Sequence, residues 1–224
     1  MDLFSAWLLC PLICLAVIAV AVANATQRDN ARQLDIARRH EWAQRNGLHY
    51  TPDDRSIEAL SARPPFGTGS HRIGHDVFRG DHRGRALVFG EYRYTTNHDD
   101  STTVHVWQFV ALALPAPRPW LSVSRATGGG LFSRRRKGLQ LESQEFNDRF
   151  RIDTGSERFA YDVLNPRTME WLLADIRANT VGFRFEGQWA ITVREGVLRP
   201  EEVKFYADFL HDVIGLVPDF VWRY

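Results

Sequence analysis

An uncharged apolar run over residues 3–23 constrains this chain more than any other feature of its sequence. At a rise of about 1.5 Å per residue, a helix of this length crosses a hydrocarbon core of roughly 30 Å. The run therefore predicts a transmembrane helix, and we assign residues 1–25 to a membrane anchor. Residues 26–47 are expected to form a juxtamembrane helix that stops at Gly47, and residues 48–224 a soluble domain.

Arginines set the expected orientation of the anchor. Only the amino terminus and Asp2 precede the run, whereas Arg28, Arg32, Arg38 and Arg39 follow it closely. Basic residues remain on the cytoplasmic side because moving them across the bilayer is unfavourable and acidic lipids attract them. The sequence predicts a single-pass protein of the cell membrane with its soluble domain in the cytoplasm.

A cleaved signal peptide is the alternative interpretation of the same segment. Ala23, Asn24 and Ala25 fit the small-x-small cleavage pattern, and cleavage there would export the domain. Against cleavage, Asp2 precedes the run without any lysine or arginine, and the run is longer than the roughly 7–15 residues of a signal peptide. The anchor is therefore the favoured interpretation.

The composition excludes several classes of function. The formal net charge is +1, so we expect no nucleic acid as a partner. Cys10 and Cys14 are the only cysteines and both lie in the apolar run, which leaves the soluble domain without a disulfide, a zinc–cysteine site or a thiol nucleophile. We expect no cofactor. The 14 phenylalanines and 7 tryptophans predict a well-supplied core.

Hydropathy periodicity predicts an α+β fold for the soluble domain. Strands are expected over 48–51, 75–80, 85–94, 102–114, 120–124, 138–142 and up to 153, with a final hairpin of 183–186 and 189–193. Helices are expected over 27–46, from Asp53 or Asp54 to Leu60, over 158–162 and 167–178, and between Pro200 and Pro218. This order is typical of a mainly antiparallel sheet with several helices, including a C-terminal helix.

Turn-forming and apolar residues add detail to this expectation. The prolines within 115–119 are expected to separate two strands, and Gly187 with Gln188 to form the turn of the last hairpin. Ile176 and Phe205 are expected on the core faces of their helices. The C-terminal aromatic residues are expected in the core rather than in a ligand site: Phe220, Trp222 and Tyr224.

Most of the soluble domain resembles a known family. The motifs that carry the resemblance are Glu-Ser…Phe-Asn…Phe within residues 139–150 and Leu-x-Pro-Arg-x-Met within residues 159–173, flanked by residues 65–67 and 217–218. They are similar to an uncharacterised family of actinobacterial membrane-anchored proteins with a soluble domain of unknown function. The resemblance implies a bacterial membrane protein, and it brings no activity and no catalytic residues.

Histidines and aspartates between residues 71 and 82 form a candidate metal site. Its members are His71, His75, Asp76 and His82. Imidazole and carboxylate groups are ligands for zinc, iron and manganese. Their spacing matches no established metal-binding pattern, and solvated loop residues are the alternative. A metal-dependent hydrolase built on this segment is the alternative function.

A glycine-rich basic loop is a candidate lipid contact. After three glycines at 128–130 come two apolar residues and a run of four cations: Leu131, Phe132, Arg134, Arg135, Arg136 and Lys137. An apolar tip beside a basic run suits an anionic membrane surface. A mobile, solvated loop is the alternative interpretation.

Ser143 also admits two interpretations. A nucleophilic serine needs a base within hydrogen-bond reach and a donor for the oxyanion. Ser143 lies three residues before Phe146, which is typical of the N-cap of a short helix, and this structural role is favoured. We therefore assign no catalytic residue. The sequence predicts a membrane-tethered, non-enzymatic domain that binds a protein partner or the anionic inner leaflet.

Overall fold

The computed structural model describes residues 3–98, 101–126 and 138–223, with side chains described from Ile18 onward except that of His98. The chain divides into two compact units, Met1–Gly47 and Leu48–Tyr224. In the second unit the order of elements is β1 (His49–Asp54), η1 (Arg55–Leu60), β2 (Ser70–His82), β3 (Arg85–His98), β4 (Ser101–Arg125), α2 (Gln144–Arg149), β5 (Phe150–Thr154), α3 (Glu157–Val163), α4 (Pro166–Ala174), α5 (Ile176–Thr180), β6 (Phe183–Glu195), α6 (Pro200–Leu216) and η3 (Asp219–Trp222).

The first unit contains one helix, α1 (Leu3–Arg45), so segment 26–45 continues the helix that begins at Leu3. Gly47 takes a left-handed conformation with φ of 67° and ends the helix as predicted. Among the described residues, no helix combines the length and the apolar composition that a membrane span needs. The side chains of residues 3–17, on which the predicted anchor depends, lie outside the described part of the chain.

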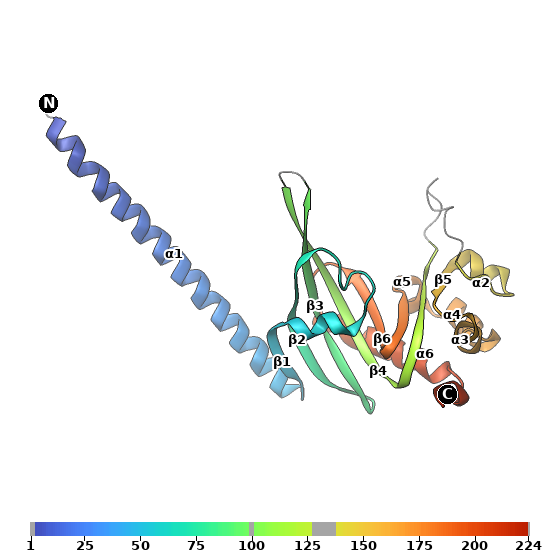
Figure 1. Ribbon diagram of the computed structural model, residues 1–224. Helices are drawn as coiled ribbons and strands as arrows, with labels where there is room; N and C mark the ends of the chain where they lie inside the picture. The colour runs from blue at the N-terminus through green and yellow to red at the C-terminus, as the bar shows by residue number, and fades with distance from the viewer. Residues whose placement is uncertain (1–2, 99–100, 127–137, 224) are drawn as a thin grey trace. The chain divides into compact units, whose positions relative to one another are not determined.

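The second unit is built on one antiparallel sheet, which confirms the predicted α+β class. Its strands follow the order β1-β2-β3-β4-β5, and β6 pairs with β4 (Figure 1). The β2–β3 hairpin turns between His82 and Arg85, as predicted. Four of the five strand pairings in the described part of the chain join strands that are consecutive in the sequence, whereas the pairing of β4 with β6 joins distant segments.

Strand β4 differs from the expectation of two strands separated at 115–119. It runs without a break for 25 residues. Pairing with β3 ends at Leu112 and pairing with β5 begins at Leu121, while the register with β6 shifts between Ala113 and Leu121. The prolines occupy this irregular stretch, where a residue without an N–H group removes no regular ladder bond.

The predicted hairpin around Gly187 is wrong. Residues 183–195 form a single strand, β6, which pairs with β4 from Trp107 to Val123. Gly187 pairs with Arg118 at the register shift, so it marks a bulge and not a chain reversal. The predicted strand at 138–142 is also absent, although the Leu139 N–H donates to the Ile152 carbonyl of β5 at 2.9 Å.

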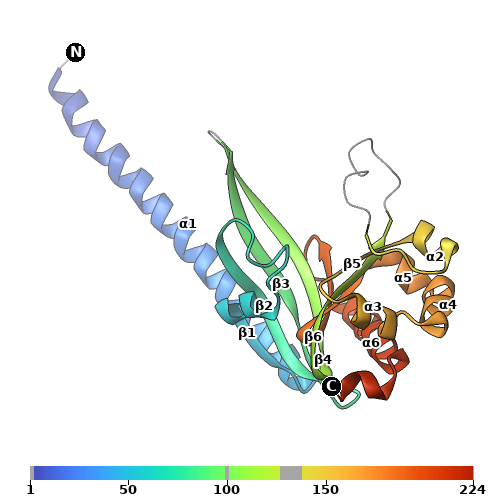
Figure 2. The same ribbon diagram turned by 45° about the vertical axis from the view of Figure 1, so that its right-hand side comes forward.

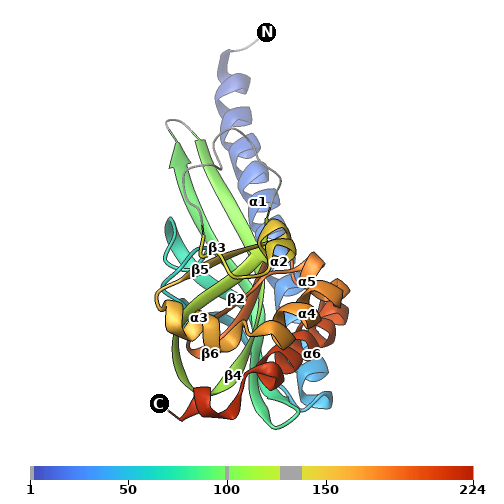
Figure 3. The ribbon, with the colours of Figure 1, turned by 90° about the vertical axis from the view of Figure 1, so that its right-hand side faces the viewer.

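Helices cover one face of the sheet, as Figure 3 shows for α3, α4 and α6. Phe183 of β6 lies 6.0 Å from Phe209 of α6 between ring centres, and Phe185 lies 6.3 Å from Phe159 of α3. Alternate residues of a strand point to opposite faces, so Arg184 turns away from these helices. Its Nη1 donates to the Pro64 carbonyl at 2.7 Å.

The opposite face is covered by η1 and the segment that follows it. The buried residues of this second core come from η1, its following segment and four strands: Ile57, Leu60, Phe66, Val77, Val88, Tyr92, Tyr94, Phe109, Ala111 and Ile191. Both faces of the sheet are therefore apolar at their centres, which holds η1 against the start of β2.

Three predicted core residues are instead exposed. The expected helix over 167–178 ends at Ala174, because the Asp175 side chain accepts the Arg177 N–H and starts a new helix. This break leaves Ile176 75 % exposed. Phe205 of α6 is 40 % exposed and Phe220 is 52 % exposed, whereas the other predicted core residues of α6 are buried. Tyr224 lies outside the described residues.

Candidate anion-binding site

A surface depression of about 620 Å³ lies where η1 meets the start of β2. Its lining carries two arginines, one histidine and one carboxylate, in the set Arg55, Glu58, Gly69, Ser70, His71, Arg72 and Ile73. With the histidine neutral, these residues hold one more positive than negative charge. The depression therefore favours an anionic group over a cationic one.

The cap of η1 holds one side of this depression in place. The Asp54 carboxylate accepts the Ser56 N–H at 2.8 Å and the Arg79 guanidinium at 2.5 Å. Partial burial alone would raise the pKa of Asp54, but the hydrogen bonds from Ser56 and Arg79 outweigh burial and lower it below 3.8. The buried Ile57 side chain then fixes η1 on the sheet.

Backbone conformation sets the other side of the depression. His71 has a left-handed φ of 51°, which is uncommon for a residue with a side chain. Its Nδ1 lies 3.2 Å from Thr95 Oγ1, and the Ser70 hydroxyl lies 3.0 Å from the same oxygen. Such conformations gather at binding sites, where the surrounding structure supports the strain.

The two arginines of the depression differ in their partners. Arg72 Nε lies 2.7 Å from Glu58 Oε1, and its Nη1 donates to the Gly67 carbonyl at 3.2 Å. Among the described residues, no carboxylate lies within 4.0 Å of the Arg55 guanidinium. Arg55 is therefore the cation of this site that remains available to an anion.

The residues of the predicted metal site are not brought together. His71 and His82 lie at opposite ends of β2, on the order of 30 Å apart at about 3.3 Å per residue. His75 Nδ1 lies 3.0 Å from Asp76, whose carboxylate also accepts the Tyr50 hydroxyl at 2.6 Å. Across the described part of the chain, no group of three or more His, Cys, Asp or Glu residues could hold a metal ion.

The predicted lipid-contact residues differ from the metal-site residues, because the structure does not describe them. Leu131, Phe132, Arg134, Arg135, Arg136 and Lys137 all lie outside the described residues. Ser143 is described, and its hydroxyl accepts the Phe146 N–H at 3.3 Å as the N-cap of α2. The structural interpretation of Ser143 is therefore confirmed.

Arg55, Ser70 and Arg72 were not singled out by the sequence. Arg55 belongs to η1 and the other two to β2, and these elements meet only because η1 docks on the sheet. One sequence feature does indicate that η1 and β2 could meet. The segment between Pro64 and Gly69 is rich in turn residues, which allow the chain to fold back.

Comparisons with known proteins identify the fold without identifying a family. No family model matches the chain, and no curated protein matches it. A crystal structure of the mycobacterial trehalose monomycolate transport factor A, TtfA, matches with a TM-score of 0.50 and 14 % sequence identity, covering 81 % of this chain and 95 % of that chain. At this identity the likeness shows a shared fold alone. The neighbour is mycobacterial, and mycobacteria are actinobacteria.

Proposed function

We propose that this chain is a membrane-tethered, non-enzymatic protein whose folded unit binds an anionic surface. The observation that carries the proposal is the excess positive charge of the Arg55 depression, where Arg72 and His71 lie beside an arginine without a described carboxylate partner. A phosphate or carboxylate group fits such a site, because guanidinium groups bind both with paired hydrogen bonds.

The tether is the apolar run over residues 3–23. Tethering holds the domain beside one membrane face and raises its effective concentration there. At this raised concentration, a shallow site of low intrinsic affinity is sufficient to hold the domain on the membrane surface. The basic loop gives a second contact in this proposal, since each basic residue near an anionic surface contributes about 1 kcal/mol. A protein partner that carries an anionic patch fits the same site.

Topology is the first measurement to make. A compartment-sensitive reporter is fused after Tyr224, and intact cells are probed with protease. We expect a cytoplasmic C-terminus, which directs the search to the inner leaflet and to cytoplasmic partners. An exported C-terminus would contradict this orientation and favour cleavage after Ala25.

The anion site is tested with the Arg55→Glu variant of residues 48–224 and vesicles with or without anionic lipid. Reversing this charge is expected to weaken association with anionic vesicles by about tenfold or more, because it removes one attraction and adds a repulsion. The matched control is Arg167→Glu at the exposed start of α4, which leaves the depression intact. Equal binding by all three proteins would exclude the depression as the contact.

A metal-dependent hydrolase is the alternative function, and no arrangement of the described side chains favours it. Elemental analysis of the purified protein tests it directly. A stoichiometric metal that is lost in His71→Ala or His75→Ala would revive this alternative.

The fold neighbour suggests the process in which the tethered domain acts. TtfA is described as a trehalose monomycolate transport factor. We propose an accessory role in glycolipid transport for this chain on the strength of the shared fold. Deletion of the gene should then change the distribution of glycolipids between membrane and surface extracts.

A further inference from the structure

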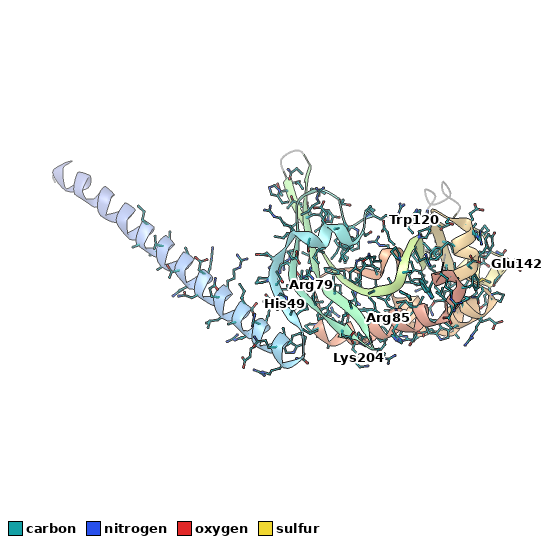
Figure 4. The ribbon with its side chains drawn as sticks, turned by 60° about the horizontal axis from the view of Figure 1, so that its bottom comes forward. His49, Arg79, Arg85, Trp120, Glu142 and Lys204 are labelled. Atoms are coloured by element: carbon teal, nitrogen blue, oxygen red, sulfur yellow. The ribbon has the colours of Figure 1, made fainter. Side chains whose placement is uncertain are left out.

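A groove beside Trp120 is separate from the Arg55 depression and independent of the anion site. It has a volume of about 500 Å³, within the roughly 300–1,000 Å³ of small-molecule sites. Strands β4 and β5, segment 138–140 and the start of α3 form it. Figures 2 and 4 show this region at the helix-rich end of the sheet, where Trp120 is labelled in Figure 4.

Trp120 is held rigidly at this groove. The guanidinium carbon of Arg63 lies 3.5 Å from the centre of the indole ring and covers one of its faces. The Trp120 carbonyl accepts the Gly155 N–H at 3.1 Å and the Thr154 hydroxyl at 3.1 Å. A Cβ at Gly155 would lie 2.4 Å from the indole Nε1, so the glycine packs directly against the ring. A ligand that contacts this ring loses little affinity to side-chain ordering.

Hydrogen-bonding groups line the rest of the groove. Asp153 is oriented by Arg151, whose Nε and Nη2 donate to its two oxygens at 2.7 and 3.0 Å. Glu157 is exposed, and within the described ranges no cation lies within 4.0 Å of its carboxylate. The Gln140 amide adds donors and an acceptor. Each carboxylate oxygen can accept more than one hydrogen bond, so acceptor capacity remains at Asp153.

These groups discriminate among classes of ligand. Asp153 and Glu157 are the charged residues of the lining, and they repel an anion. A cation gains little from the indole face, because Arg63 already occupies the cation–π position over Trp120. The selection against a cation therefore rests on the indole and not on the carboxylates. A neutral ligand with many hydroxyl groups uses the carboxylates and the indole together. Its O–H groups donate to the carboxylates, and its C–H groups pack against the electron-rich indole.

We propose that the Trp120 groove is a binding site for a neutral carbohydrate of hexose or disaccharide size. Glu157 and Asp153 accept sugar hydroxyl groups, Gln140 donates to one, and Trp120 provides the apolar contact. Thr154 does not contact the sugar, because its hydroxyl is engaged by the Trp120 carbonyl and the Ser156 N–H.

Saturation-transfer difference NMR on the full chain in phosphatidylcholine nanodiscs tests this proposal. The probes are glucose, maltose and trehalose, with choline and inorganic phosphate as charged competitors, each up to about 10 mM, which covers the millimolar affinities of weak ligands. We expect transfer to the ring C–H protons of at least one sugar and no displacement by choline or phosphate. No transfer to any of the three sugars, or displacement by a charged probe, would overturn the proposal.

Variants locate the binding. Trp120→Ala should abolish the signal, and the exposed Glu157→Ala should weaken it by about fivefold, the loss of one hydrogen bond of about 1 kcal/mol. Glu170→Ala, on the exposed surface of α4, is the matched control and should bind as the wild type does. If Trp120→Ala does not fold, the signal of Glu157→Ala shows whether the sugar binds in this groove. An unchanged signal in Glu157→Ala together with Gln140→Ala would place the sugar elsewhere and refute the assignment.

Discussion

At the scale of a single residue, the Asp208 carboxylate of α6 binds the β2–β3 hairpin to that helix. It lies 2.9 Å from His82 Nε2, 3.0 Å from Arg83 Nη2 and 2.6 Å from Lys204 Nζ. Burial acts to raise the pKa of Asp208, but the hydrogen bonds from Lys204 and His82 and the charge of Arg83 lower it below 3.8. His82 therefore links the hairpin to α6 in this arrangement.

Asp208→Asn is expected to reduce the free energy of unfolding at pH 5 by on the order of 1–2 kcal/mol. The native pKa lies below the unfolded value near 3.8, so the carboxylate contributes its stability above that value and loses it as the pH falls through the native pKa. Urea titrations of wild type and variant at pH 5, 4 and 3 measure the difference, which should shrink as the pH falls. A difference that stays constant over this range would contradict the assignment.

The sequence predicted the role of single residues correctly where the group that each residue binds lies nearby in the chain. Ser143 caps α2 and Asp54 caps η1, because a cap and its helix are adjacent in the chain. It did not find Arg55 or Arg72 as members of one site, because their neighbours come from a distant segment. Nothing in the local sequence distinguishes these two arginines from the many others.

At the scale of elements, a bulge in β2 depends on a glycine in β3. The register between these strands shifts between His75 and Phe78, and Asp76 within the shift has a φ of 50°. The bulged backbone comes so close that a Cβ at Gly90 would lie 2.8 Å from the Asp76 carbonyl oxygen and 3.0 Å from the Val77 Cα. Backbone on both sides cannot move without disturbing the ladder.

Gly90→Ala should therefore destabilise the fold by about 1–3 kcal/mol through overpacking. The matched control is Gly215→Ala in α6, where an added Cβ meets nothing within 4 Å. The control should be neutral or stabilising by about 0.5–1 kcal/mol, because alanine favours helix more than glycine does. Urea unfolding followed by circular dichroism compares the two. Equal stabilities for Gly90→Ala and the wild type would show that the strands can separate at the bulge.

Elements were predictable where their ends carry local signals. Pro200 and Pro218 bracket α6, and Gly47 ends α1. The pattern failed at β4 and β6, where 115–119 and Gly187 resemble strand ends but lie inside continuous strands. Each of these strands continues because β4 and β6 pair with each other on both sides of the irregular stretch, with Arg118 opposite Gly187 inside it. The period of the hydropathy pattern indicates local conformation, and it does not show which distant strand will pair with a segment.

At the scale of the whole molecule, the residues after Gly47 contain everything that a separate domain needs. All six strands and both apolar faces of the sheet belong to Leu48–Tyr224. Residues 48–224 expressed alone are therefore expected to unfold in one cooperative urea transition, with a free energy of unfolding of about 5–15 kcal/mol. A non-cooperative transition, or poor dispersion of amide signals by NMR, would show that the domain needs its N-terminal helix.

The sequence by itself determined the α+β class, the helical N-terminal segment, the boundary at Gly47 and the local caps, because hydropathy period and capping chemistry act between residues close in the chain. It also predicts the membrane anchor and the basic lipid contact, which stay predictions. Only the tertiary structure decided which residues share a site. It separated His71 from His82 along one strand, and it joined Arg55 to Arg72 and Trp120 to Glu157. The physical reason is that long-range strand pairing and core packing, rather than local propensity, bring distant side chains together.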